Sequence, residues 1–148
     1  MAVLAAGRTW LKRPAAAEEA LCALRAEAGV DLPEEYFAFL RFSNGGEGPL
    51  PIAPYNFCLD CAEDVLGYLR EKLYEEFFPE FFVFGSSGGG DYVAFDLRRA
   101  QPWPVVAIDM TNTDLTESVD PIAGDFASFL AIVGLTRSSA AGGMTSAG

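Results

Sequence analysis

The fold is decided by Leu32-Pro33-Glu34-Glu35-Tyr36-Phe37-Ala38-Phe39-Leu40, a segment that runs into Ser43-Asn44-Gly45-Gly46. Proline suits the first turn of a helix because its missing N–H has no helical partner there, and the two glutamates complement the positive end of the helix dipole. The aromatic residues fall on one broad stripe, and Asn-Gly can adopt the left-handed conformation that ends a helix. The pattern predicts a helix that is mostly buried.

Three further helices are predicted around this one. Residues 15–28 are rich in Ala, Glu, Leu and Arg, which are strong helix formers. Asp60 and Glu63 resemble a capping box, and the apolar residues after them recur at three- and four-residue spacing until Pro79 closes the helix. Asp125 is placed to cap a last helix.

Three short runs of aromatic and β-branched residues, 81–84, 92–95 and 105–108, are typical of strands. The roughly seven to nine residues between them are too few for crossover helices, so the strands should pair antiparallel as a meander. Gly48 to Pro54 contains three prolines, which limits it to a short edge strand or an extended loop. The predicted fold is therefore α+β, with a central, mostly antiparallel sheet flanked by about four helices.

The length and composition indicate one domain. A chain of 148 residues with 51% hydrophobic residues and 12 Phe can bury a sizeable single core. We expect a flexible lead-in over residues 1–14, the domain over 15–135 and a disordered tail over 136–148, since the last residues are mostly Ser, Ala, Gly and Thr.

The net charge of −11, with no histidine, argues against nucleic acid or an anionic membrane as a partner, because phosphate contacts need Lys and Arg. A basic protein fits better, although acidic chains also gain solubility from their charge alone. Three cysteines cannot all pair, the start of the chain does not have the pattern of a signal peptide, and no apolar run is long enough to span a membrane. We therefore expect a cytoplasmic protein.

The glycine-rich segment from Gly85 to Gly90 suggests a phosphate-binding loop at first sight. A phosphate loop requires Gly-Lys-Ser or Gly-Lys-Thr running into a helix, whereas Asp91 and another strand follow here. A carboxylate also repels phosphate. A β-turn in which glycine supplies positive φ is the better interpretation.

The pair Cys58 and Cys61 has the spacing of a redox pair or of half a zinc site, and Cys61 at a helix start is expected to have a lowered thiol pKa. A structural zinc ion needs four ligands, and the chain has no histidine to complete them. A thiol or metal function stays open as a minor alternative to two small, partly buried residues.

Carboxylates at strand ends are the other candidates for chemistry. Asp91, Asp96 and Asp109 could collect into a metal or acid/base site, but aspartate is also ordinary at turns. Nucleophilic catalysis lacks its usual groups, because no Ser or Cys stands beside a recognisable base. We predict no catalytic residues, no cofactor and no metal.

In one long stretch of the chain, all charged residues are acidic. From Gln101 to Thr136 there is no Lys or Arg, and a second acidic set follows the predicted third helix. If the two sets share a face, they would attract a basic protein, while a merely solvated loop is the alternative. The residues predicted to bind the partner are Asp109, Asp114, Glu117, Asp120 and Asp125, with Glu71, Glu75 and Glu76 behind them.

Five features follow one another along the chain: Leu32-Pro33 leading an aromatic helix into Asn44-Gly45-Gly46, a strand ending in Gly85, the strand Asp91-Tyr92-Val93-Ala94-Phe95-Asp96, the strand from Val105 to Asp109, and a closing helix from Ala123 to Leu130. In this order they resemble the SUKH superfamily, and more narrowly its branch named for the yeast cell-wall synthesis regulator and killer-toxin resistance protein. The resemblance covers roughly residues 18–135, and the proline-rich segment from Gly48 to Cys61 departs from the family pattern.

The resemblance implies an α+β fold without enzymatic activity. Bacterial members of this superfamily are typically immunity proteins that neutralise toxin domains, often nucleases, by direct binding. The expected function is therefore that of an immunity-type protein whose carboxylates cover the basic groove of a toxin domain. An intracellular regulatory or scaffold protein of the same fold is the alternative.

Overall fold

A computed structural model describes residues 2–4, 10–74, 78–111 and 119–137 of the chain. Four helices lie within these residues: α1 (Glu18–Ala28), α2 (Glu34–Phe42), α3 (Ala62–Glu71) and α4 (Phe126–Val133). The main sheet runs in the order β2 (Leu11–Lys12), β3 (Gly46–Pro49), β4 (Asn56–Leu59), β5 (Phe81–Ser86), β6 (Asp91–Asp96), β7 (Val105–Asp109) and β8 (Val119–Ala123). The short strands β1 (Ala2–Leu4) and β9 (Leu135–Arg137) form a separate pair.

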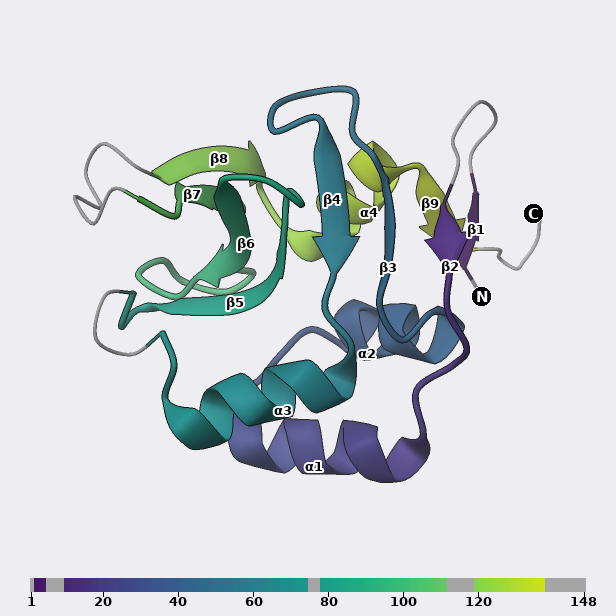
Figure 1. Ribbon diagram of the computed structural model, residues 1–148, viewed down its shortest axis with the longest axis vertical. Coiled ribbons are helices and arrows are strands. Elements are labelled where there is room, and N and C mark those ends of the chain that lie inside the picture. The colour runs from purple at the N-terminus through teal and green to yellow at the C-terminus, as the bar shows by residue number, and fades with distance from the viewer. Residues whose placement is uncertain (1, 5–9, 75–77, 112–118, 138–148) are drawn as a thin grey trace.

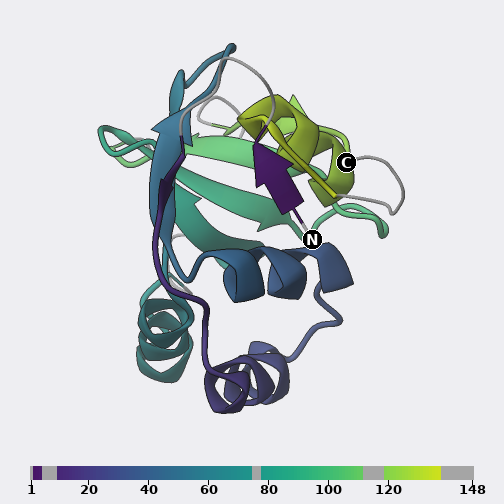
Figure 2. The same cartoon turned by 90° about the vertical axis from the view of Figure 1, so that its right-hand side faces the viewer.

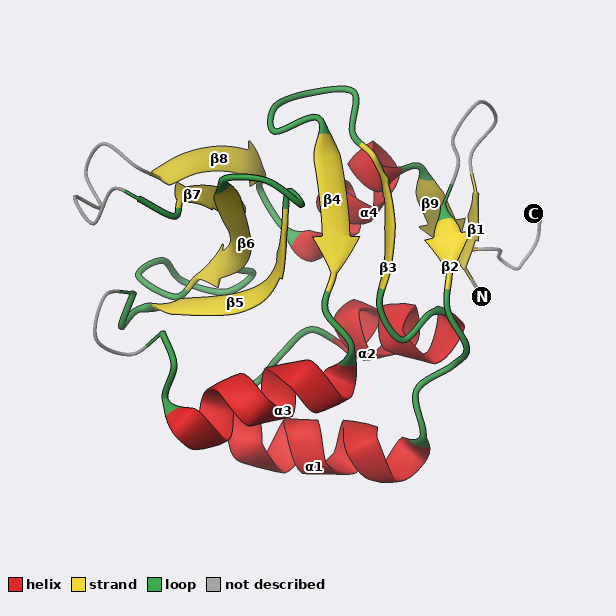
Figure 3. Ribbon diagram, in the orientation of Figure 1, coloured by secondary structure: helices red, strands yellow, loops and turns green. Residues whose placement is uncertain are grey.

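Every strand pair in the main sheet is antiparallel, which confirms the predicted α+β fold and the β5–β6–β7 meander. The helices α1 and α3 lie side by side on the lower side of the molecule, and α2 lies between them and the sheet (Figures 1 and 2). The fourth helix lies behind the sheet in the view of Figure 3. No helix among the described residues is long and apolar enough to cross a membrane.

The core is built around α2, the aromatic helix that follows Leu32-Pro33. Tyr36 of α2 is fully buried, and its ring packs against Phe84 of β5 at 5.6 Å, Phe95 of β6 at 5.9 Å and Phe126 of α4 at 5.9 Å between ring centroids. The predicted burial of the aromatic stripe is thus observed. Packing of aromatic rings at these separations is favourable beyond the area that it buries.

The third helix differs from its prediction at both ends. Asp60 does not form a capping box, because the N-cap position belongs to Cys61 and no side chain of that residue caps the helix. The side-chain oxygen of Asn44 instead accepts a hydrogen bond from the N–H of Ala62 at 2.8 Å, so the loop after α2 caps α3. The helix stops at Glu71, well before Pro79, because Lys72 adopts the left-handed conformation with φ 54°.

Two features of the sheet were not predicted. Of the proline-rich segment, only Gly48 and Pro49 belong to β3, where they lie beyond the pairing with β2, and residues 50–55 form a loop, so the predicted edge strand and extended loop are observed. The pairing of β2 with Gly46 and Glu47 was not predicted. The strand β2 belongs to the predicted lead-in, and beside it Trp10 is buried and donates a hydrogen bond from Nε1 to Ser43 Oγ at 3.2 Å. The second feature is β8, which forms the opposite edge of the sheet.

Candidate partner-binding surface

Three aspartates gather at one corner of the sheet, where β6 and β8 begin and β7 ends. Asp91 is paired with Asp109 across β6 and β7, and Asp120 is paired with Ala107 across β7 and β8. Because alternate residues of a strand share a face, all three carboxylates lie on the same face of the sheet. We call Asp91, Asp109 and Asp120 the acidic corner.

The acidic corner holds like charges close together. Partial burial raises the pKa of the Asp91 carboxyl, and the charges of Asp109 and Asp120 raise it further. The pKa of Asp109 moves the other way, because the N–H and the hydroxyl of Thr111 both donate to its Oδ1, at 2.9 and 2.8 Å. The two pKa values shift in opposite directions because Asp109 accepts two hydrogen bonds from Thr111 and Asp91 does not.

No Lys or Arg among the described residues forms an ion pair with the acidic corner. Like charges on directly paired residues of two strands destabilise a sheet. The repulsion between these carboxylates is not offset by an ion pair within the described residues, so the corner is a candidate for contact with a cationic partner.

The remaining predicted interface residues do not join the acidic corner where they are described. Asp125 follows the far end of β8, and its Oδ1 accepts the N–H of Ser128 at 2.8 Å as the predicted N-cap of α4. Hydrogen bonds from the side chain and then the N–H of Ser128 lower the pKa of Asp125. Glu71 is exposed at the end of α3. The other four predicted residues lie outside the described residues: Glu75, Glu76, Asp114 and Glu117.

The glycine-rich turn between β5 and β6 is held by its serines. Ser87 Oγ accepts the N–H groups of Gly89 at 3.1 Å and of Asp91 at 3.2 Å, and Gly88 has a positive φ of 78° as predicted for a turn. The side chain of Asn56 in β4 donates to the carbonyl of Ser87 at 2.8 Å. The turn therefore connects β4 directly to the acidic corner.

The two cysteines are partly buried, as the favoured interpretation predicted. Burial raises the thiol pKa of Cys61, and its acidic neighbours Asp64 and Glu63 raise it further, so the expected lowering at the helix start is wrong. Burial and the nearby Glu47 likewise raise the pKa of Cys58. Both thiols are unpaired in the structure. A raised pKa lowers the thiolate fraction that redox chemistry needs.

Asp96 lies at the opposite end of β6 from Asp91, so the three strand-end aspartates do not form the joint site that was considered as an alternative. Arg98 pairs with the buried Asp96 carboxylate at 2.9 Å. Burial raises the pKa of Asp96, but the hydrogen bonds and charge of Arg98 outweigh it and leave the pKa lowered. Within the described part of the chain, no group of three or more Cys, Asp or Glu side chains is placed to hold a metal ion.

A row of tyrosines, which the sequence analysis missed, lies beside a partly buried carboxylate. Tyr74 packs against Tyr68 at 5.3 Å and against Tyr92 at 5.0 Å between ring centroids. Burial, with a contribution from Asp64, raises the pKa of Asp60 to about 6. Burial raises the pKa of both Tyr68 and Tyr74; Asp60 raises the pKa of Tyr68 further, and Tyr92 and then Asp60 raise that of Tyr74.

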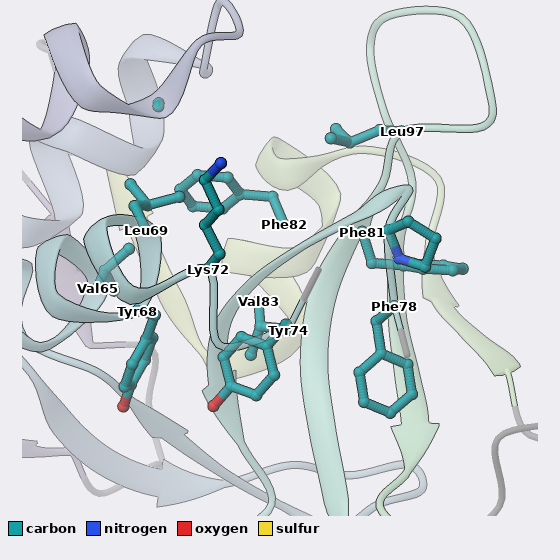
Figure 4. A pocket seen from close by; sticks show the side chains of 12 residues that line it. Val65, Tyr68, Leu69, Lys72, Tyr74, Phe78, Phe81, Phe82, Val83 and Leu97 are labelled. Carbon is teal, nitrogen blue, oxygen red and sulfur yellow. The ribbon is translucent and has the colours of Figure 1, made fainter. Parts of the chain in front are cut away.

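Tyr68 and Tyr74 line a shallow groove of about 200 Å³ between α3 and β5 (Figure 4). Their hydroxyl groups point the same way, and Lys72 extends to the other side of the groove. Small-molecule sites usually enclose about 300–1,000 Å³, so this groove is too small for a typical cofactor.

The chain matches the family model described as SMI1 / KNR4 family (SUKH-1) over residues 15–132, well over half of its length. The protein belongs to the SUKH-1 family. This confirms the resemblance noted from the order of the sequence motifs. No protein of curated function matches the chain. Membership in SUKH-1 is consistent with an immunity-type, partner-binding role and directs attention to surfaces such as the acidic corner.

Proposed function

We propose that this protein is a cytoplasmic, non-enzymatic immunity protein that binds and neutralises a basic toxin domain. The observation that carries the proposal is the acidic corner, where Asp91, Asp109 and Asp120 share one face without a cationic partner among the described residues. Membership in SUKH-1 supports a protein partner, and the net charge of −11 supports a basic one.

A cationic groove on the partner would supply the positive charges that the acidic corner lacks. Lys and Arg side chains would relieve the repulsion among the three carboxylates, so complex formation recovers energy that the free protein loses. The same charges act at a distance before contact and speed the encounter of the two proteins. The predicted residues Asp114 and Glu117 belong to the segment between Asp109 and Asp120 and extend this proposed contact.

The test uses the protein encoded beside this gene as the toxin. We expect co-expression to rescue cells from that product. The double variant Asp109→Lys/Asp120→Lys should slow association in vitro by about tenfold or more at low salt, and the wild-type association rate should fall steeply as salt rises.

The matched control is Glu19→Lys/Asp31→Lys, which changes exposed carboxylates on and after α1. Each replacement changes the charge by two, so both double variants go from −11 to −7. The control should associate within about threefold of the wild-type rate, because charges outside the acidic corner contribute little to the electrostatic field there. An association rate that is insensitive to salt, or equal losses in both double variants, would contradict the proposal. Binding without rescue would favour a regulatory role.

A further inference from the structure

The loop of residues 50–55 joins β3 and β4 and projects beyond the sheet in two perpendicular views (Figures 1 and 2). Two of its side chains are unusually exposed for apolar residues, Ile52 at 41% and Tyr55 at 67%. We call residues 50–55 the hairpin tip.

The hairpin tip is held in one shape rather than left loose. The N–H of Leu50 donates to the carbonyl of Tyr55 at 3.1 Å, and the N–H of Tyr55 donates to the carbonyl of Ile52 at 2.7 Å. Leu50 itself is only 4% exposed and anchors the tip in the core. A loop that is already ordered loses little conformational entropy when it binds.

The backbone of Tyr55 is strained. Its φ of 69° lies in the left-handed region, which costs a bulky residue free energy that Gly or Asn avoids. Burial offsets little of this cost, because the residue is 67% exposed. A strained backbone that presents an aromatic ring to solvent indicates a role outside the folded core.

The hairpin tip is continuous with the acidic corner. Asn56 follows the tip and donates both to Glu47 Oε2 at 3.0 Å and to the carbonyl of Ser87 at 2.8 Å. The N–H of Ser87 donates to the carbonyl of Asp91 at 2.9 Å, and the N–H of Met110 donates to the carbonyl of Gly90 at 2.9 Å. A projecting apolar tip thus stands beside carboxylates on one edge of the molecule.

We propose that the hairpin tip is the apolar anchor of the complex and inserts Ile52 and Tyr55 into a concave apolar pocket of a protein whose rim is rich in Lys and Arg. The convex, apolar shape requires a concave, apolar complement, and the adjacent carboxylates require a basic rim. Buried aromatic anchors dominate binding energies in such interfaces, while rim charges mainly set the association rate. The inference rests on the proposed function and names the kind of site that the partner offers.

The experiment measures association and dissociation rates of the adjacent-gene product with full-length variants. Tyr55→Asn removes the ring and relieves the positive φ, so its melting temperature should equal or exceed that of the wild type. Ile52→Ser removes the second anchor. Each variant should dissociate about tenfold faster or more, with an association rate within about threefold of the wild type.

The matched control is Leu73→Ser, which removes an apolar side chain of similar exposure, 51%, that lies after α3 and outside the tip. It should dissociate at the wild-type rate. Dissociation of both tip variants within twofold of the wild type overturns the inference. If Asp109→Lys/Asp120→Lys weakens the same complex while the tip variants do not, only this inference fails. If the wild-type protein does not bind, the proposed function fails as well.

Discussion

Replacing Asp60 with Asn should stabilise the protein above pH 6. The residue follows β4, where its N–H donates to the carbonyl of Phe84 at 3.0 Å, and its side chain is only partly exposed. No Lys or Arg among the described residues pairs with it, and the neighbouring Asp64 carries the same charge. Asn keeps the shape, the backbone hydrogen bond and an oxygen that can accept from the Tyr68 hydroxyl, but it removes the partly buried charge.

The size of the effect follows from the pKa of Asp60, which rises from 3.8 to about 6, mainly because of burial. The folded protein therefore holds this proton more tightly than the unfolded chain, so its stability falls as the pH rises from about 4 to about 6. A pKa that differs by about two units between the unfolded and the folded protein corresponds to about 3 kcal/mol of unfolding free energy at most. Solvent screening of a partly exposed group reduces this to about 1–2 kcal/mol.

Urea unfolding of the wild type and Asp60→Asn at several pH values checks this prediction. The gain in unfolding free energy should be near zero at pH 4 and should reach its full value above pH 6.5. Asp64→Asn should give a smaller gain, because it removes only the second cause of the raised pKa. Glu19→Gln, at an exposed position on α1, serves as the control. A gain for Asp60→Asn that is the same at pH 4 and pH 7 would refute the reasoning.

Two further predictions concern the fold. Gly85→Ala should destabilise the protein by about 2 kcal/mol in urea unfolding, because its Cβ would collide with the carbonyl of Cys58 and the ring of Phe57, whereas Gly90→Ala meets nothing within 4 Å and should be nearly neutral. Asn44→Ala should cost about 1 kcal/mol in the same assay, because α3 loses its cap, and an unchanged midpoint would contradict the assigned cap.

The helices and the meander could be predicted because their signals are local. The aromatic stripe of α2, the cap at Asp125 and the apolar runs of β5, β6 and β7 each depend on residues that are close in the chain. The position of β3 could not be found in this way. The pairing of β2 with β3 at Gly46 and Glu47 joins residues more than thirty positions apart, and Pro49, the one proline of β3, lies beyond that pairing.

The candidate site, like the fold, could be predicted from the sequence only in part. The sequence indicated an acidic surface, because a long stretch without Lys or Arg is visible by inspection. It did not separate Asp125, which caps a helix, from Asp109 and Asp120, which share a face with Asp91. The alternation of prolines with Ile52 and Tyr55 was the signal for the hairpin tip, but by itself it indicates only a limit on strand formation.

The sequence by itself determined the class of fold, the family and the sign of the charge, because periodicity, motif order and composition are properties of the chain alone. Only the tertiary structure decided which carboxylates stand together and which side chains stand exposed, because strand register sets the face of each residue. The buried helix begun at Leu32-Pro33 supports that sheet from below. The proposed partner-binding surface lies at the opposite end of the molecule, along the hairpin tip and the acidic corner.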